Sequence, residues 1–114
     1  MKLNRAALLA VAMLLSACAA NNNIYYWGDY SETAYNFKKD PTPANRTAHV
    51  KALLDIIDHA DKQHKKVPPG IYAELGLMEA QDHDKEKALQ YFAMEKKLFP
   101  ESSPLIDRMV KDVK

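Results

Sequence analysis

The chain has 114 residues, too few for two ordinary domains. Its 16 basic and 15 acidic residues give a formal net charge of +1, which excludes the strong general attraction to nucleic acid that a basic protein has. Cys18 is the only cysteine, and this excludes an internal disulfide.

The first 17 residues have the pattern of a cleaved signal peptide. Lys2 and Arg5 give a positive start, residues 6–15 are apolar, and small residues precede Cys18. A helix of about ten residues spans roughly 15 Å against a bilayer core of roughly 30 Å, so this run is too short to cross a membrane. The run Leu15-Ser16-Ala17-Cys18 resembles the lipobox of bacterial lipoproteins, in which the cysteine is acylated and becomes the first residue.

The lipobox resemblance implies a lipid anchor at Cys18, and several acyl chains hold a protein on a membrane stably. Ala19 follows the cysteine, where an aspartate would imply retention at the inner membrane, so the resemblance implies the outer membrane. An ordinary secretory signal that carries an incidental cysteine is the alternative. We predict three segments: signal peptide 1–17, lipidated tether and aromatic segment 18–27, and a helical domain 28–114. The mature chain would have 14 basic and 15 acidic residues.

A cluster of large side chains follows the polar residues 19–23. It consists of Ile24, Tyr25, Tyr26 and Trp27. Aromatic rings with a polar edge favour protein interfaces and the headgroup region of a membrane. Alternatively, Trp27 and one tyrosine pack against the first helix. Both interpretations remain open at this point.

Proline and capping residues divide the rest of the chain into helices. Residues 29–39 form the first predicted helix, which Asp40-Pro41 ends. Thr42 before Pro43 has the pattern of an N-cap followed by a proline at the first helical position. The helix that begins there has apolar residues at helical spacing. They are Val50, Leu53, Leu54, Ile57 and Ala60.

Three further helices follow the break at residues 67–70. The third runs to about Gln81, and Asp82 or Asp84 caps the fourth, which ends near Phe99. Ser103-Pro104 is predicted to cap the last helix. Its apolar stripe is predicted to contain Leu105, Ile106, Met109, Val110 and Val113. No segment alternates with the period of a strand, so the predicted fold class is all-α.

Residues 67–102 resemble a single tetratricopeptide repeat. The small residues Gly76 and Ala88 would let two helices approach closely, Phe92 would fill the wedge between them, and Pro100 would end the second helix. The residues at the spacing of the repeat are Tyr72, Leu75, Gly76, Ala88, Phe92 and Pro100. Residues 28–34 parallel residues 70–76, which indicates a second copy. The resemblance implies two tetratricopeptide-like hairpins and a C-terminal capping helix, although Glu79 and Glu95 depart from the repeat pattern.

The polar residues do not form a recognisable catalytic or metal-binding motif. His59 and His64 are five residues apart, so they do not share one helical face, and the only cysteine belongs to the lipobox. Glu32 and Glu74 take the same place in the two repeats, where carboxylates favour the first turn of a helix. We therefore predict no enzyme activity, no metal site and no cofactor.

The predicted function depends on a binding surface. In a tetratricopeptide hairpin the first helix lines a concave face that takes up partner segments. The resemblance therefore places the partner-binding side chains Tyr35, Lys38, Leu77 and Gln81 on that face. Alternatively, Tyr35 and Leu77 are core residues beneath the N-terminal aromatic residues or the last helix.

Three stretches, residues 26–30, 67–76 and 99–102, are similar to a family of small proteobacterial lipoproteins. Such proteins are typically encoded beside a lipoprotein similar to the curli secretion channel. The similarity implies a non-enzymatic, periplasm-facing accessory of a secretion-channel-like complex in the outer membrane, with other outer-membrane lipoproteins as partners. A pilotin-like or outer-membrane assembly adaptor is one alternative. A small-molecule or enzymatic pocket between the hairpins is another.

The Cys18→Ser variant tests the anchor. Serine cannot form the thioether that carries the lipid, so we expect the variant to be released or to remain an uncleaved precursor. Metabolic labelling with a fatty-acid analogue measures this, with the unsubstituted chain as the labelled reference. Label retained by the variant would overturn the lipoprotein interpretation.

Overall fold

A computed structural model of the chain describes residues 4–10 and 23–114. Residues 1–3 and 11–22, which include Cys18, lie outside the described residues, and so do the predictions made for them. The described chain is all-helical, as predicted, and residues 5–10 form a short helical stretch. The domain contains α2 (Tyr30–Lys39), α3 (Pro43–Lys62), α4 (Ile71–Gln81), α5 (Lys85–Leu98), the 3₁₀ turn η1 (Pro100–Ser102) and α6 (Ser103–Val113). None of the helices in these described ranges is long and apolar enough to cross a membrane.

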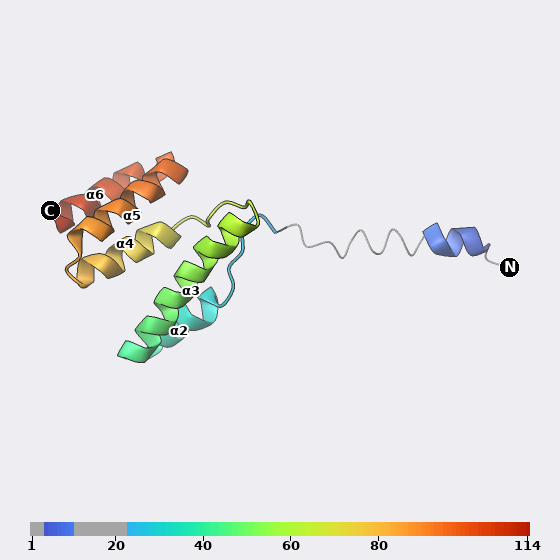
Figure 1. The fold of residues 1–114 in the computed structure, drawn as a ribbon, viewed down its shortest axis with the longest axis horizontal. Coiled ribbons are helices and arrows are strands. Elements are labelled where there is room, and N and C mark those ends of the chain that lie inside the picture. Colours follow the sequence, from blue (N-terminus) through green and yellow to red (C-terminus); the bar gives the residue numbers. More distant parts are fainter. Residues whose placement is uncertain (1–3, 11–22) are drawn as a thin grey trace.

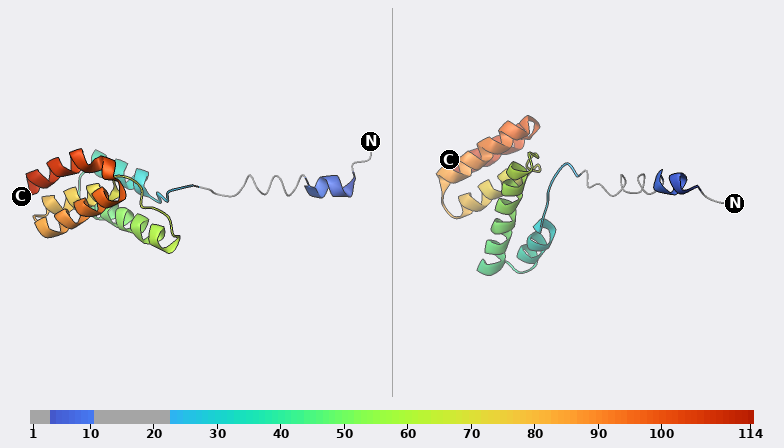
Figure 2. Two further views of the ribbon diagram at one scale, coloured as in Figure 1. Left: turned by 90° about the horizontal axis from the view of Figure 1, so that it is seen from above. Right: turned by 45° about the vertical axis from the view of Figure 1, so that its right-hand side comes forward.

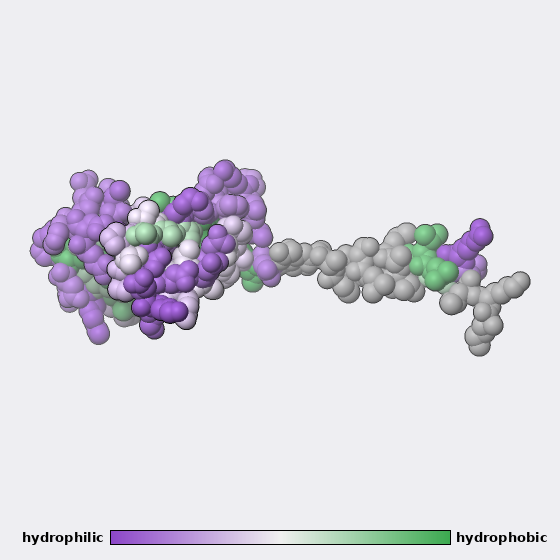
Figure 3. Space-filling view, turned by 90° about the horizontal axis from the view of Figure 1, so that it is seen from below, coloured by the Kyte–Doolittle hydropathy of each residue, from purple (hydrophilic) through white to green (hydrophobic). Residues whose placement is uncertain are grey.

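The helices form two hairpins and a closing helix. Helices α2 and α3 pack as the first hairpin, α4 and α5 as the second, and α6 lies against α5 (Figures 1 and 2). The chain enters the domain beside the C-terminal end of α3, whereas the C-terminus lies on the opposite side (Figure 1). The face shown in Figure 3 is largely hydrophilic, with less polar patches between the charged side chains.

Local sequence signals account for the starts of two helices. The Thr42 hydroxyl oxygen accepts a hydrogen bond from the Asn45 backbone N–H at 3.1 Å, and Pro43 occupies the first position of α3. Asp84, not Asp82, caps α5, because a carboxylate oxygen of Asp84 accepts from the Lys87 N–H at 3.0 Å. Both helices therefore begin where a side chain satisfies a free backbone donor.

The start of the last helix differs from the prediction. Ser103 is already the first residue of α6, and its hydroxyl donates to the Pro100 carbonyl oxygen at 2.7 Å instead of capping the helix. Leu105 was predicted to lie in the apolar stripe, but it is 55% exposed. The stripe that packs consists of Ile106, Met109, Val110 and Val113. Leu105 therefore lies outside the face of α6 that packs against α5.

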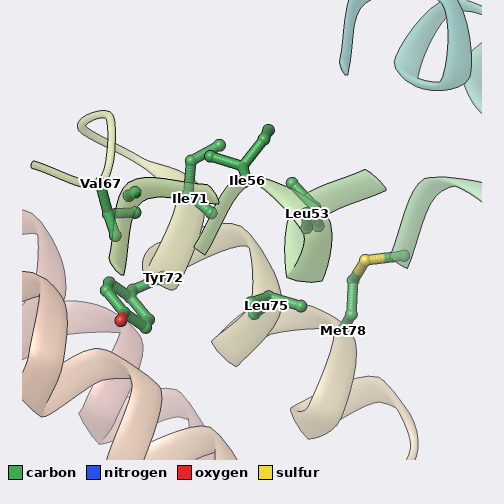
Figure 4. Close-up of a cluster of buried hydrophobic side chains, with 8 residues drawn as sticks. Leu53, Ile56, Val67, Ile71, Tyr72, Leu75 and Met78 are labelled. Carbon is green, nitrogen blue, oxygen red and sulfur yellow. The ribbon is translucent and has the colours of Figure 1, made fainter. Parts of the chain in front are cut away.

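The main hydrophobic core joins the two hairpins. Leu53 and Ile56 of α3 are fully buried against Ile71 and Leu75 of α4, as Figure 4 shows. Burial of each such side chain contributes about 1.5–3 kcal/mol relative to leaving it in water. The same cluster also contains Ala60, Val67, Tyr72 and Met78. This core holds the second hairpin against the first.

A second core lies where α4, α5 and α6 meet. Gly76 leaves the space that the Phe92 ring fills, because a Cβ atom at Gly76 would lie 2.5 Å from a ring carbon of Phe92. Ala88, Phe92 and Ile106 have no exposed surface and form one cluster. A small residue at position 88 therefore matters for the packing of three helices.

We predict that Ala88→Leu destabilises the domain. The larger side chain would overpack the contact with Phe92 and Ile106 at a cost of about 1–3 kcal/mol. For a domain of this size that cost lowers the melting temperature by several degrees. Thermal unfolding followed by circular dichroism measures the change.

The matched control is Ala93→Leu on the same helix, because Ala93 is exposed. We expect the control to melt within about a degree or two of the unsubstituted domain, since exposed substitutions usually change stability by less than about 0.5 kcal/mol. Equal melting temperatures for the two leucine variants would contradict the packing described here.

Candidate functional site

The structure places the four predicted partner-binding side chains at the surface. Tyr35 is 63% exposed and Leu77 is 40% exposed, so neither is a core residue. Lys38 and Gln81 are exposed as well. Tyr35 and Lys38 come from α2, and Leu77 and Gln81 come from α4, two helices whose Cα atoms all stay more than 8 Å apart.

An apolar groove lies elsewhere, between the second helices of the two hairpins. It has a volume of about 540 Å³. Leu54 and Ile57 of α3 form one wall, Met94 and Leu98 of α5 form the other, and Tyr72 of α4 lies at the base. Leu54 is 45% exposed and Met94 is 38% exposed, so large apolar side chains remain open to solvent along the groove.

Charged side chains surround the apolar walls. Asp58 and Asp61 lie on the α3 side, and Lys65 and Lys66 lie in the segment that closes one end. Lys62 pairs with Asp58 at 2.7 Å. Among the described residues, the other three charges have no ion-pair partner within 4.0 Å and remain available to a ligand.

Tyr72 at the base of the groove keeps its hydroxyl proton. Burial raises the pKa of the Tyr72 phenol, and the neighbouring Tyr91 and the carboxylates of Asp61 and Glu95 raise it further. The Tyr72 and Tyr91 ring centroids are 6.0 Å apart. A neutral phenol can donate a hydrogen bond to a ligand in the groove.

The sequence contained a signal for the groove. Leu54, Ile57, Asp58 and Asp61 are spaced at i, i+3, i+4 and i+7, which places them on one face of α3. This face adjoins the buried one that carries Leu53 and Ile56, because Ile57 also packs against the core. A helix with apolar residues on two faces can cover a core with one and line a groove with the other.

A partly buried network of polar side chains links the two hairpins. The Tyr30 hydroxyl donates to Glu74 Oε2 at 2.9 Å, and His49 Nε2 lies 2.5 Å from Glu74 Oε1. On its other side, His49 Nδ1 lies 2.8 Å from the Thr33 hydroxyl oxygen. His49 is 1% exposed. No local sequence pattern predicts this network, because its members are up to 44 residues apart in the chain.

Thr33, His49 and Glu74 follow the order hydroxyl, imidazole, carboxylate of a hydrolytic triad. Their surroundings favour a structural role. His49 is too deeply buried to meet a substrate. The Thr33 hydroxyl lies 3.0 Å from the Asp29 carbonyl oxygen and 3.2 Å from that of Tyr30, so its proton has acceptors inside α2. The Glu74 side chain holds His49 Nε2 on one side and the Tyr30 hydroxyl on the other. The network therefore positions helices.

Glu95 is a buried carboxylate outside the Glu74 network. It is 3% exposed, and its Oε1 accepts from the Gly70 backbone N–H at 2.7 Å. Its Oε2 has no hydrogen-bond partner in the described structure. Pro68 and Pro69 have no N–H, and Gly70 has no side chain that could cap α4. The carboxylate of Glu95 supplies that cap from the neighbouring helix.

Comparison with known families gives one match. The family described as "Domain of unknown function (DUF4810)" matches residues 24–109. The chain belongs to the DUF4810 family. No curated protein and no solved structure matches the chain. The matched DUF4810 region contains the groove, the Glu74 network and Glu95, so these are features of the family domain in this chain.

Further polar contacts of this DUF4810 domain join neighbouring helices. Within residues 4–10 and 23–114, no group of three or more histidine, cysteine, aspartate or glutamate side chains is arranged to hold a metal ion. Arg46 donates to the Met78 carbonyl oxygen at 2.9 Å and to Asp82 at 2.8 Å, and Lys96 pairs with Asp107 at 2.6 Å. These pairs join neighbouring helices.

We predict that Glu74→Ala destabilises the domain. The substitution would leave the buried His49 ring and the Tyr30 hydroxyl without their acceptor, at a cost of about 1–3 kcal/mol. Glu32→Ala is the matched control, because Glu32 occupies the first turn of α2 but is exposed. Both variants lose a first-turn carboxylate, so their difference reports the network. Equal unfolding free energies of the two variants in urea would contradict a stabilising role of the network.

Tyrosine titration gives a second measurement on the same variants. Burial and the hydrogen bond to Glu74 raise the Tyr30 pKa from 10.0 to about 12. Because the folded pKa is the higher one, this contribution to stability is complete below about pH 10 and is lost as the pH rises through about 12. Ultraviolet absorbance of phenolate should therefore show Tyr30 ionising at lower pH in Glu74→Ala than in Glu32→Ala.

Proposed function

We propose that the chain is a non-enzymatic interaction module that a lipid at Cys18 anchors to the periplasmic face of the outer membrane. There it acts as an assembly accessory of a curli-type secretion-channel-like complex. The observation that carries the interaction role is the open apolar groove between α3 and α5. The membrane location is supported by the N-terminal pattern of charge, apolar residues and lipobox.

The groove has the chemistry of a site for a segment of another protein. Its walls expose Leu54 and Met94, and methionine adapts readily to the shape of a partner. An amphipathic helix can place apolar residues on such walls. The free charges then favour one orientation, with basic side chains of the partner near Asp61 and its negative C-terminal end near Lys65 and Lys66.

The proposed occupant is an amphipathic helix of the channel-like outer-membrane lipoprotein. The resemblance to small proteobacterial lipoproteins supports this choice of partner, through the typical neighbourhood of their genes. A pilotin-like or outer-membrane assembly adaptor would use the same groove for another membrane protein. The face with Tyr35, Lys38, Leu77 and Gln81 is the alternative docking surface.

The groove also supports a second candidate function. A volume of about 540 Å³ lies in the range of small-molecule sites, about 300–1,000 Å³, and the groove lies between the hairpins. An apolar small molecule with an acidic group would match the apolar walls and Lys65 or Lys66. This candidate accounts for the groove without a protein partner.

Two matched double variants separate the surfaces. Leu54→Ala with Met94→Ala removes two exposed side chains from the groove, and Tyr35→Ala with Leu77→Ala removes two from the alternative surface. Loss of interface anchors costs about 2 kcal/mol or more, so we expect affinity for the channel-like lipoprotein to fall at least tenfold in the groove variant alone. Co-purification of lipidated protein from membranes, with circular dichroism for folding, measures this.

The outcomes discriminate between the candidates. Loss of the partner only in the Tyr35 and Leu77 variant would move the interface to the alternative surface. If both double variants fold and still recover the partner fully, the partner binds at neither surface. A groove variant that keeps the protein partner but loses a co-purifying small molecule would favour the second candidate function.

A further inference from the structure

Large apolar side chains at the start of the domain are not covered by the described chain. Ile24 is 72% exposed and Trp27 is 42% exposed. The Tyr25 ring stands edge-on to the Trp27 ring, with centroids 6.4 Å apart. These three residues and Asn23 line a shallow hollow of about 430 Å³. Hydrophobic surface is visible at this N-terminal edge of the domain in Figure 3.

This segment is fixed to the domain by its other side. The Tyr26 ring stacks on His59 of α3, with centroids 4.1 Å apart, and Trp27 stands edge-on to Tyr30 of α2 at 5.4 Å. Gly28 has a φ of +47° and lies under the Tyr26 ring, where a Cβ atom would meet the Tyr26 hydroxyl at 2.9 Å. The contacts of Tyr26 and Trp27 therefore attach the segment to the domain, while Ile24 and part of Trp27 remain exposed.

The exposed residues of this segment are of the types that contact membranes. Tryptophan and tyrosine favour the headgroup level of a bilayer, where one part of the ring is apolar and the other is wet. Ile24 adds purely apolar area beside them. The residues between Cys18 and Ile24 can span at most about 21 Å, so a lipid at Cys18 would keep the segment near the membrane surface.

We propose that Ile24, Tyr25 and Trp27 form a second contact with the bilayer, in which their side chains enter the interfacial layer of the lipid. This inference rests on the lipid anchor of the proposed function. Its consequence is orientation: the anchor alone leaves the domain free to rotate, whereas two contacts direct the C-terminal end of α3 toward the membrane. Helix α6 and the C-terminus then lie away from it (Figure 1).

Trp27 is the only tryptophan, so its fluorescence reports this contact directly. The lipidated protein is placed in vesicles of phosphatidylethanolamine and phosphatidylglycerol that contain a phospholipid brominated near the headgroup end of its acyl chains. We expect Trp27 emission to shift to shorter wavelength and to be quenched by the brominated lipid. We also expect protection from acrylamide in the aqueous phase. Flotation of the vesicles measures anchoring in the same samples.

A pair of aspartate variants supplies the control. Ile24→Asp places a charge in the contact and should reduce both the quenching and the spectral shift, while flotation remains complete. Leu105→Asp changes an equally apolar, 55% exposed residue on α6, and should leave Trp27 emission unchanged. Both substitutions are at exposed positions, so circular dichroism should show the same helix content.

Each outcome separates the second contact from the anchor. Flotation with an unquenched, acrylamide-accessible Trp27 would overturn the second contact and leave the anchor intact. Quenching that Ile24→Asp does not reduce would show that the acyl anchor alone positions Trp27, which also overturns the proposal. Failure of the unsubstituted protein to float would overturn the anchor and this inference together.

Discussion

The spacing of the two hairpins depends on the carboxylate of Glu74. This group comes from α4, accepts a hydrogen bond from Tyr30 of α2, and meets His49 of α3 at 2.5 Å. Since the backbones of α2 and α4 stay more than 8 Å apart at every Cα pair, these side chains make the polar connection between them. A buried imidazole needs partners at both nitrogens, and Thr33 and Glu74 supply them from two different helices.

The groove follows from that arrangement, because its two walls belong to different hairpins. Leu54 and Ile57 project from α3, and Met94 and Leu98 project from α5, so the distance between the walls is set by how α4 packs on α3. The shared hydrophobic core fixes one side of this packing. Arg46 fixes the far end of α4 through the Met78 carbonyl and Asp82. Because these contacts already hold the groove, binding of the proposed partner there would carry a smaller ordering cost.

The sequence was sufficient for the elements and insufficient for the contacts between them. Local rules identified the helices, because proline and capping residues such as Thr42 and Asp84 act within a few positions of the chain. They failed at Leu105, whose spacing matched the apolar stripe although its side chain is 55% exposed. The His49 network and the groove depend on residues from three helices, and neither caps nor periodicity specify which faces meet. For Tyr35 and Leu77 the spacing alone allowed either a surface position or a core position, because exposed and buried apolar residues can have the same helical spacing.

Glu95 shows why one departure from the repeat pattern is compatible with the fold. The resemblance favours a small residue there, yet burial of a carboxylate is costly unless hydrogen bonds compensate it. Pro68 and Pro69, which precede α4, have no backbone N–H to donate. The next N–H is that of Gly70, and Glu95 Oε1 accepts a hydrogen bond from it. The positive end of the α4 dipole favours the same negative charge. This bond ties the segment after Lys65 and Lys66 to α5, beside Met94. The charged end of the groove is therefore held to one of its apolar walls by a residue that departs from the repeat pattern.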